Sequence, residues 1–298
     1  MKIEIARANH ADSPAALDTS SVSFRRRLLR NKLSFAAFCA IGLLVVIAIL
    51  APWIAPLDPN EPDANAVLER PSWAHVLGTD DYGRDELSRI IIASRIDLLV
   101  PFVSTFLALL IGSLIGAISG FRGGWLDQIV TRIVDAVMAF PAFVLAMGLT
   151  AAIGSSITNL ILVIAVTQVP VYLRQLRAEM LREREMEYAQ AARTIGNPIW
   201  RIVFIHLFPN CFPTLIVQAT LAMGFVLLTL AGLSYIGLGI QPPDSEWGEM
   251  VSEGASLMVT GHWWLSLFPG IAIMVTVLVF NLVGDGLRDL LDPRMRGR

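Results

Sequence analysis

The residues that could serve as bases, nucleophiles or metal ligands are few, and their spacing limits their chemistry. The four histidines are scattered along the chain, as His10, His75, His206 and His262. No two of them have the short spacing of a zinc site. The sequence also lacks Gly-x-Ser-x-Gly, the turn motif that exposes a nucleophilic serine. We therefore predict no catalytic residue and no metal site in this chain.

The lysines exclude a second kind of chemistry. A phosphate-binding loop ends in Gly-Lys-Ser or Gly-Lys-Thr, so its lysine follows a glycine directly. The chain has only Lys2 and Lys32, and neither follows a glycine. We predict that it binds no ATP or Mg²⁺ of its own. If the protein performs ATP-driven work, the nucleotide chemistry lies on another chain.

The composition is that of an integral membrane protein. Of 298 residues, 55% are hydrophobic and only 16% are charged, with a mean hydropathy of +0.62, whereas about a quarter of an average soluble domain is charged. The net charge of −2 gives no reason to propose a nucleic acid as partner. Cys39 and Cys211 lie in or beside apolar runs far apart in the sequence, which indicates no disulfide framework. We predict an all-α polytopic protein in contact with lipid.

Six apolar runs approach the roughly 20 residues that a spanning helix needs. They lie at residues 33–54, 96–119, 133–153, 160–172, 215–240 and 265–283. The fourth is short, and Gln168 and Pro170 interrupt its end. We predict a polar, basic tail over residues 1–32 and one transmembrane domain of about six helices over residues 33–298.

Basic residues mark the cytoplasmic side. Five of them precede the first span, and the others gather in segments that alternate to the same side: Arg122 and Arg132; Arg174, Arg177, Arg182, Arg184, Arg193 and Arg201; Arg288, Arg294, Arg296 and Arg298. We predict a multi-pass protein of the plasma (inner) membrane with both termini in the cytoplasm, an extracytoplasmic loop at 56–92 and a cytoplasmic loop at 175–210. Arg84, Arg89 and Arg95 fall on the outer side among carboxylates and do not change this topology.

The longest cytoplasmic loop has a helical pattern of its own. Met186, Ala189, Ala192 and Ile195 recur at three-residue spacing, and Gly196-Asn197-Pro198 then breaks the run. Pro198 can open a second helix with an apolar side. We predict two short helices joined by a sharp turn, with small alanines that let a partner's pocket close over the first. The alternative is an amphipathic connector that lies in the membrane interface.

Polar and small residues within the spans suggest two further roles. Gly112, Gly116 and Gly120 form one stripe, which favours close helix packing over ligand contact. Polar side chains facing lipid cost energy, so those in spans are candidates for a translocation path. The candidates are Asp135, Gln218, Thr220, Thr229, Ser234 and Tyr235. The alternative for each is a hydrogen bond between helices.

Several segments resemble one family. Glu187, Ala191, Ala192 and Gly196, followed by Leu207 and Pro209, resemble the EAA loop of ATP-binding-cassette (ABC) importer permeases. Four longer blocks are similar to the dipeptide, oligopeptide and nickel branch, in its second, C-type chain: HVLGTDDYGRDELSR, RIVDAVMAFP, LSYIGLGIQPPDSEWGEM and NLVGDGLRDLLDPR. Ile205, Phe208, Glu86 and Asp97 depart from the pattern of that branch.

The resemblance implies a type I-like permease that forms half of a translocation path for peptides. It implies a second permease subunit, two ATPase subunits that hold ATP and Mg²⁺, and an extracytoplasmic substrate-binding protein. The coupling residues would be the six named above. Nickel or another small solute is the alternative cargo. A secondary transporter or channel, or a membrane scaffold, is the alternative class, although the spans lack the mid-membrane charge pairs typical of ion-driven carriers.

Overall fold

The computed structural model describes residues 32–291, which are mostly helical. The elements are α2 (Lys32–Ile54), α3 (Glu86–Arg122), α4 (Gly124–Met138), α5 (Ala142–Ile153), α6 (Ile157–Glu183), α7 (Glu187–Thr194), α8 (Ile199–Arg201), the π-helical turn η1 (Ile202–Leu207), α9 (Phe208–Tyr235), α10 (Trp247–Leu257), the 3₁₀ turn η2 (Met258–Thr260) and α11 (Trp264–Leu291). Within these residues the β pairing is a single bridge between Thr79 and Asp85. The all-α prediction is confirmed.

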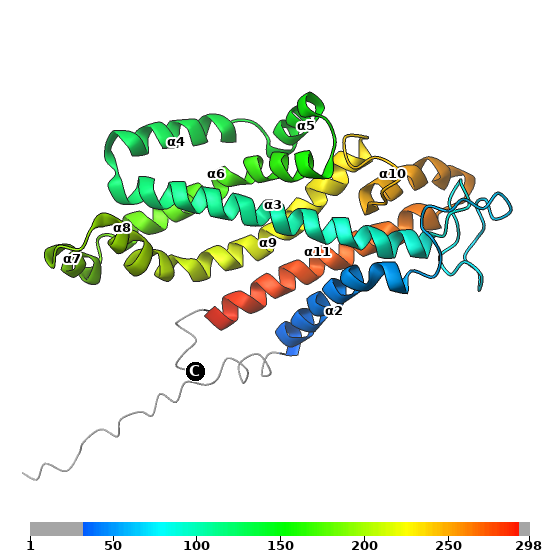
Figure 1. The fold of residues 1–298 in the computed structure, drawn as a ribbon, viewed down its shortest axis with the longest axis horizontal. Coiled ribbons are helices and arrows are strands. Elements are labelled where there is room, and N and C mark those ends of the chain that lie inside the picture. Colours follow the sequence, from blue (N-terminus) through cyan, green and yellow to red (C-terminus); the bar gives the residue numbers. More distant parts are fainter. Residues whose placement is uncertain (1–31, 292–298) are drawn as a thin grey trace, which may run out of the picture.

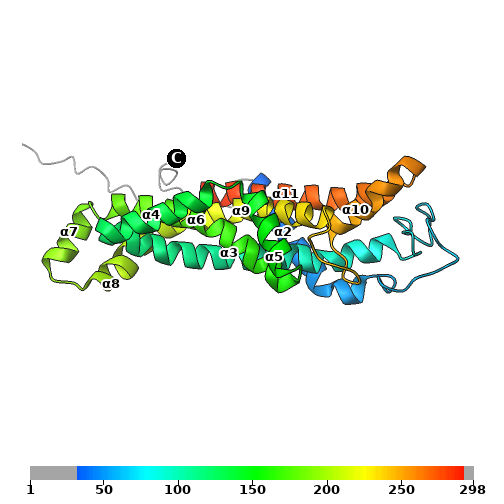
Figure 2. The same ribbon diagram turned by 90° about the horizontal axis from the view of Figure 1, so that it is seen from above.

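The long helices lie side by side in an elongated body with two distinct ends (Figure 1). At one end lie α7 and α8, and we call this the α7 end. At the other lie α10 and the loop between α2 and α3, and we call this the α10 end. Figure 2 shows the same separation from above. The N-terminal tail and the last arginines that we predicted to be cytoplasmic fall in residues 1–31 and 292–298, outside the described residues.

Within residues 32–291, five helices are long and apolar enough to cross a membrane: Lys32–Ile54, Glu86–Arg122, Ile157–Glu183, Ile199–Tyr235 and Trp264–Leu291. The predicted third span, at 133–153, is instead a pair of helices, α4 and α5, bent by 86° at the break between them. Pro141 precedes α5, and a proline both lacks an N–H and disfavours a helical conformation at the residue before it. Counted as one span, the pair brings the total to six.

The predicted fourth span ends later than the apolar run. Helix α6 continues through Gln168 and Pro170, both buried, to Glu183. A proline inside a spanning helix is tolerated when neighbouring helices pack against it, and α3 lies along most of α6. The predicted fourth-to-fifth loop at 175–210 therefore contains the last turns of α6. The loop predicted at 56–92 ends earlier, because Asp85 caps the start of α3 by accepting a hydrogen bond from the Ser88 amide.

The glycine stripe sets the distance between α3 and α6. A Cβ atom on Gly112 would lie 2.7 Å from the carbonyl oxygen of Val169, and one on Gly116 would lie 2.5 Å from that of Leu173. On Gly120 it would lie 2.7 Å from the Arg177 carbonyl oxygen. Real Cβ atoms do not approach so closely, so any side chain at these positions would push the two helices apart.

Candidate functional site

Helix α7 is a short helix that projects from the α7 end. It begins at Glu187 and is followed by Gly196, whose φ of +84° lies in the left-handed region. Glycine adopts that conformation without the steric cost that other residues meet. The Asn197 side chain donates a hydrogen bond to the Ala192 carbonyl, 3.2 Å away, and closes the turn. The predicted sharp turn is therefore present.

The second predicted helix is not separate. From Ile199 the chain runs through α8 and the π-helical turn η1 directly into α9, as one helix from Ile199 to Tyr235. Pro198 opens it, as expected for a proline before a first helical turn. The consequence is mechanical: any displacement of the Gly196 turn acts on the end of a spanning helix.

Two of the three alanines of α7 face inward and are not available to a partner, whereas Ala191 is exposed. Ala189 and Ala192 are buried and pack with Ile202, Val203 and Leu207 in one core cluster. Their small size lets α7 lie close to η1. Of the six predicted coupling residues, Ala192 and Leu207 are buried, whereas Glu187, Ala191, Gly196 and Pro209 are exposed.

The turn after α7 carries the apolar surface. Ile195 is 81% exposed, and Ile199 and Trp200 are also more than half exposed. Large apolar side chains grouped on a surface mark a place that another protein or a membrane covers. Gly196 belongs to this turn, and Glu187 and Ala191 are exposed on α7, so α7 and the turn together form a candidate docking surface.

Tyr188 connects α7 to the helices on both sides of it. Its hydroxyl donates a hydrogen bond to Glu183 Oε2 at the end of α6, at 2.6 Å. It accepts one from Asn210 Nδ2 near the start of α9, at 2.9 Å. Burial, together with the hydrogen bond to Glu183, raises the pKa of Tyr188 to about 12, so the hydroxyl keeps its proton. The sequence does not predict that Tyr188 links α6 and α9. It shows only a tyrosine next to Glu187, which does not indicate such a link.

A second polar cluster joins three helices near the same end. Asp127 of α4 accepts a hydrogen bond from Arg177 Nη2 of α6 at 2.7 Å and one from Ser119 Oγ of α3 at 2.6 Å. Arg184 donates to the Gly120 carbonyl at 3.1 Å. These contacts join α3, α4 and α6.

The six predicted path residues do not form one cluster. Asp135 pairs with Arg174 at 2.8 Å, and both are about half exposed. Thr220 and Thr229 donate hydrogen bonds to carbonyls of their own helix, and each bond is 2.9 Å long. Ser234 is buried and Tyr235 is half exposed near the α10 end. The threonine hydrogen bonds lie within α9 itself and do not join two helices, and a place on the translocation path stays a prediction.

Gln218 is the candidate that lines a polar cavity. The cavity has a volume of about 470 Å³ and lies between α6, α9 and α11 toward the α7 end. Its polar lining residues are Gln175, Arg182, Asn210, Thr214, Gln218 and Arg288. Thr214 and Gln218 are four residues apart, a spacing that places them on one helix face and that could have identified the cavity. Such a lining offers hydrogen-bond donors and acceptors and two guanidinium groups.

The α10 end holds a buried charge cluster. Arg89 is 2% exposed, and its guanidinium lies 2.7 Å from Asp80 Oδ2 and 2.8 Å from Glu253 Oε2. Arg84 also pairs with Asp80, at 2.6 Å. The Glu246 carboxylate caps α10 by accepting two backbone N–H bonds, each 2.9 Å long. Two of the three outer arginines thus have carboxylate partners, as their sequence neighbourhood suggested.

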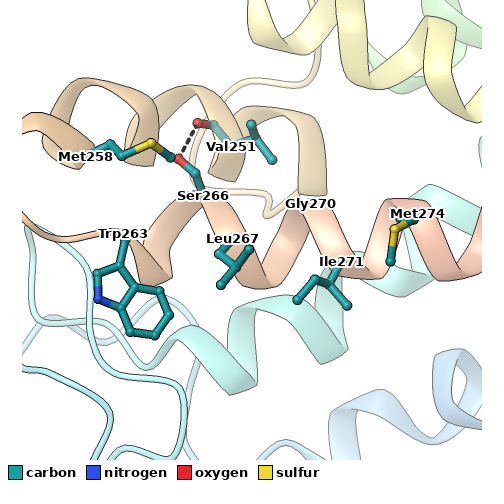
Figure 3. Close-up of a pocket in the computed structure, with 8 residues that line it drawn as sticks. All are labelled: Val251, Met258, Trp263, Ser266, Leu267, Gly270, Ile271 and Met274. Atoms are coloured by element: carbon teal, nitrogen blue, oxygen red, sulfur yellow. Dashed lines mark hydrogen bonds between the residues drawn. The ribbon is translucent and has the colours of Figure 1, made fainter.

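A groove between α10 and α11 is apolar and carries no charged group. It has a volume of about 540 Å³ and is lined by Val251, Met258, Trp263, Ser266, Leu267, Gly270, Ile271 and Met274. Figure 3 shows Trp263, Leu267 and Ile271 on one side of α11, while the Ser266 hydroxyl bonds the Val251 carbonyl at 3.1 Å. Within residues 32–291 no three His, Cys, Asp or Glu side chains are placed to hold a metal ion.

Comparisons with known proteins agree with this architecture. Residues 112–297 match the family described as binding-protein-dependent transport system inner membrane component, and residues 22–71 match the N-terminal transmembrane domain of oligopeptide transport permease C. A probable D,D-dipeptide transport system permease protein of Escherichia coli is 44% identical over 268 residues, 90% of each chain.

Two further relatives are similar over the same extent. A dipeptide transport system permease protein of Alkalihalophilus pseudofirmus is 40% identical, covering 91% of this chain and 89% of the relative. A glutathione transport system permease protein of Pectobacterium atrosepticum is 39% identical, covering 92% and 91%. With a family match over more than half of its length and full-length relatives, the chain belongs to the family of inner membrane components of binding-protein-dependent transport systems.

Proposed function

We propose that this chain is a permease subunit of an ATP-driven ABC importer of short peptides and forms half of its translocation path. A second permease subunit forms the other half, two ATPase subunits bind beneath them, and an extracytoplasmic binding protein delivers cargo. The observation that carries the proposal is the placement of α7, whose exposed neighbourhood offers a docking surface while Tyr188 ties it to both α6 and α9.

The orientation follows from charge. The α7 end carries Arg182, Arg184, Arg193 and Arg201, and basic residues stay in the cytoplasm. Both termini then lie on the cytoplasmic side, and the α10 end faces the exterior. This orientation puts the docking surface on the side where ATP is present.

The coupling is a difference in binding between two conformations. An ATPase dimer that closes on ATP shifts the permease only if its closed form binds the outward-facing conformation better. Closure displaces α7, and the displacement reaches α9 through the continuous helix from Ile199 and reaches α6 through the Tyr188 hydroxyl. Cargo then enters from the binding protein and leaves toward the α7 end.

The proposed cargo class is supported by the relatives and by the polar cavity. Their names specify dipeptides and glutathione, which carry amide groups and carboxylates. Gln175, Gln218 and Thr214 can exchange hydrogen bonds with peptide amides, and Arg182 and Arg288 can bind a carboxylate through their guanidinium groups.

The first experiment is affinity purification of the tagged chain from its native host in mild detergent, followed by mass spectrometry. Recovery of a protein with Gly-x-x-x-x-Gly-Lys-Ser/Thr and of a second permease is expected. The co-encoded binding protein is then titrated with a labelled dipeptide and with chelated nickel. Recovery of this chain alone, even after crosslinking, would overturn the importer, and tight binding of nickel but not dipeptide would overturn the cargo.

A further inference from the structure

The three outer arginines have different surroundings. Arg84 and Arg89 pair with Asp80 and Glu253. Arg95 lies farther along α3, about 14 Å from the first residue of that helix at 1.5 Å per residue. Its side chain is exposed, and among residues 32–291 it has no hydrogen-bond or ion-pair partner. The Arg95 guanidinium is therefore not part of the buried charge cluster, and its positive charge is not balanced there.

Arg95 lies in an apolar groove. The groove has a volume of about 690 Å³ and is lined by α2 (Ile41, Val45, Ala48, Ile49), α3 (Arg95, Leu98, Leu99, Phe102), α9 (Thr220, Met223) and α11 (Phe280, Val283). Thr220 already uses its hydroxyl hydrogen on the Ile216 carbonyl. Among the described residues that line the groove, Arg95 is the only charged one, and none is a carboxylate.

The groove opens toward the surroundings of the helices. Val45 and Ile49 of α2, and Leu99 and Phe102 of α3, are lining residues whose side chains are between 44% and 62% exposed. All four helices are long and apolar enough to cross a membrane. The groove is therefore at membrane depth, where its exposed edges meet hydrocarbon.

A cation in such a place needs a counter-charge, because an uncompensated charge within the hydrocarbon region is costly. The rest of the lining needs an apolar occupant. A free phosphate would satisfy only the guanidinium, and a neutral lipid would satisfy only the apolar walls. We propose that the groove binds an anionic phospholipid of the leaflet at the α10 end, with its phosphate groups on Arg95 and an acyl chain between α2 and α3.

The test uses the full chain with its co-purifying partners in detergent and measures bound lipid by native mass spectrometry. The probes are phosphatidylglycerol and phosphatidylcholine with identical acyl chains. The wild type is expected to prefer phosphatidylglycerol, and Arg95→Gln to lose about fivefold of this preference, since one basic residue near a membrane contributes about 1 kcal/mol. Arg95→Lys is expected to retain most of it.

Two further variants separate the charge from the groove. Arg70→Gln removes an exposed positive charge in the loop at the same end, without touching the groove, and is expected to leave the preference unchanged. Ala48→Phe places an aromatic ring where Ala48 lines the groove, and it is expected to weaken the binding of both lipids equally. A thermal unfolding curve for each variant confirms that it is folded.

Three results would overturn the proposal. The first is an Arg95→Gln variant that keeps the wild-type preference. The second is an equal loss with Arg70→Gln, which would show a diffuse surface effect. The third is a cysteine at Leu99 that crosslinks efficiently to a co-purified permease in native membranes, because a protein would then cover the groove. By contrast, labelling of Phe102 or Phe280 by phosphatidylglycerol with a photoreactive acyl chain would support the proposed lipid site.

Discussion

The two ends of the molecule are held together by different interactions. At the α10 end, buried ion pairs join α3, the preceding loop and α10 around Arg89. At the α7 end, a helix of eight residues is attached by two small buried alanines and the Tyr188 hydroxyl, and it leaves Ile195 exposed. The first arrangement fixes neighbouring elements to one another. In the second, the proposed displacement of α7 by a partner would reach α6 and α9 through few contacts.

Close packing strengthens the contrast. A Cβ atom on Gly248 of α10 would lie 2.4 Å from the Ala231 Cα of α9, and one on Gly254 would lie 2.5 Å from the Leu265 backbone. The Trp247 indole N–H bonds the Ile90 carbonyl at 3.0 Å. At the α7 end, a Cβ on Gly196 would meet nothing within 4 Å. Mutations should therefore affect stability at the α10 end and coupling at the α7 end.

The largest effect is expected for Arg89→Met. This change removes the two short ion pairs of Arg89 and leaves Arg84 as the remaining cation beside Asp80 and Glu253. Removal of one partner from a buried ion pair costs about 3–5 kcal/mol. We expect much less folded protein in the membrane and a large fall in Tm, measured on detergent-extracted chain. Arg70→Met is the control, since Arg70 is exposed in the same loop region. An unchanged Tm for Arg89→Met would show that this end is not fixed by the cluster.

The second prediction concerns Tyr188→Phe. The change removes the hydrogen bond to Glu183 and the one from Asn210 but keeps the ring. We expect a fall in peptide uptake per ATP hydrolysed of about tenfold, equivalent to about 1.4 kcal/mol of coupling free energy, with a small change in Tm.

Asn210→Ala tests whether the contacts act together. If α7 is coupled through this chain of hydrogen bonds, the variant that carries both Tyr188→Phe and Asn210→Ala should take up about as much peptide per ATP hydrolysed as Tyr188→Phe alone. The effects of neighbours in one hydrogen-bond network are not additive. Uptake and ATP hydrolysis that fall in parallel in Tyr188→Phe would contradict a coupling role and indicate loss of the assembled complex.

The elements were predictable from the sequence where a single periodic property determines them. Apolar length located the spans, and glycines four residues apart predicted a close helix contact on one face of α3, whose partner the structure identifies as α6. The break before Pro141 was missed because the hydropathy of 133–153 is continuous, and the course of α6 past Pro170 was missed because a neighbouring helix supports it.

The contacts within the sites could not be predicted in the same way. Tyr188 with Asn210, and Arg89 with Glu253, join residues far apart in the chain, and no local pattern specifies such pairs. The polar residues of the spans were predicted by type alone. The structure places Gln218 in a polar cavity and puts Thr229 into a hydrogen bond within its own helix. A role in transport stays a prediction for each of the six.

The third prediction changes the docking surface without changing the fold. Gly196→Arg puts a bulky cation into open space but on a left-handed backbone, and Glu187→Arg reverses a charge on the exposed start of α7. We expect both chains to insert normally and to recover less ATPase on affinity purification, by about threefold to tenfold for a loss near 1 kcal/mol.

Gly196→Ala is the matched control for the backbone. It carries the same left-handed strain, about 1 kcal/mol, without the added charge or bulk. If Gly196→Ala loses as much ATPase as Gly196→Arg, the turn conformation matters and the surface does not. Wild-type assembly and transport in Glu187→Arg and Gly196→Arg would exclude α7 as the docking element.

The smallest effect is expected from pH at the α10 end. Burial, and then the charge of Glu253, raise the pKa of Glu249 to about 7 in the folded chain, whereas its ordinary value is 4.5. Arg89 and Arg84 oppose this shift and Glu246 adds to it. A carboxyl with a raised folded pKa contributes stability that is complete below pH 4.5 and is lost as pH rises through about 7.

The wild-type Tm should therefore be higher at pH 6 than at pH 8, by about 2–4 °C for about 1 kcal/mol. Glu249→Gln, which cannot ionise, should flatten this dependence and raise the Tm at pH 8. Glu187→Gln at the α7 end is the control and should leave the pH profile unchanged, because Glu187 is exposed and docking does not enter the unfolding of the isolated chain. An unchanged profile in Glu249→Gln would mean that another carboxyl of the cluster carries the titration. A wild-type Tm that is equal at pH 6 and pH 8 would mean that the two ends differ in packing but not in their response to protons.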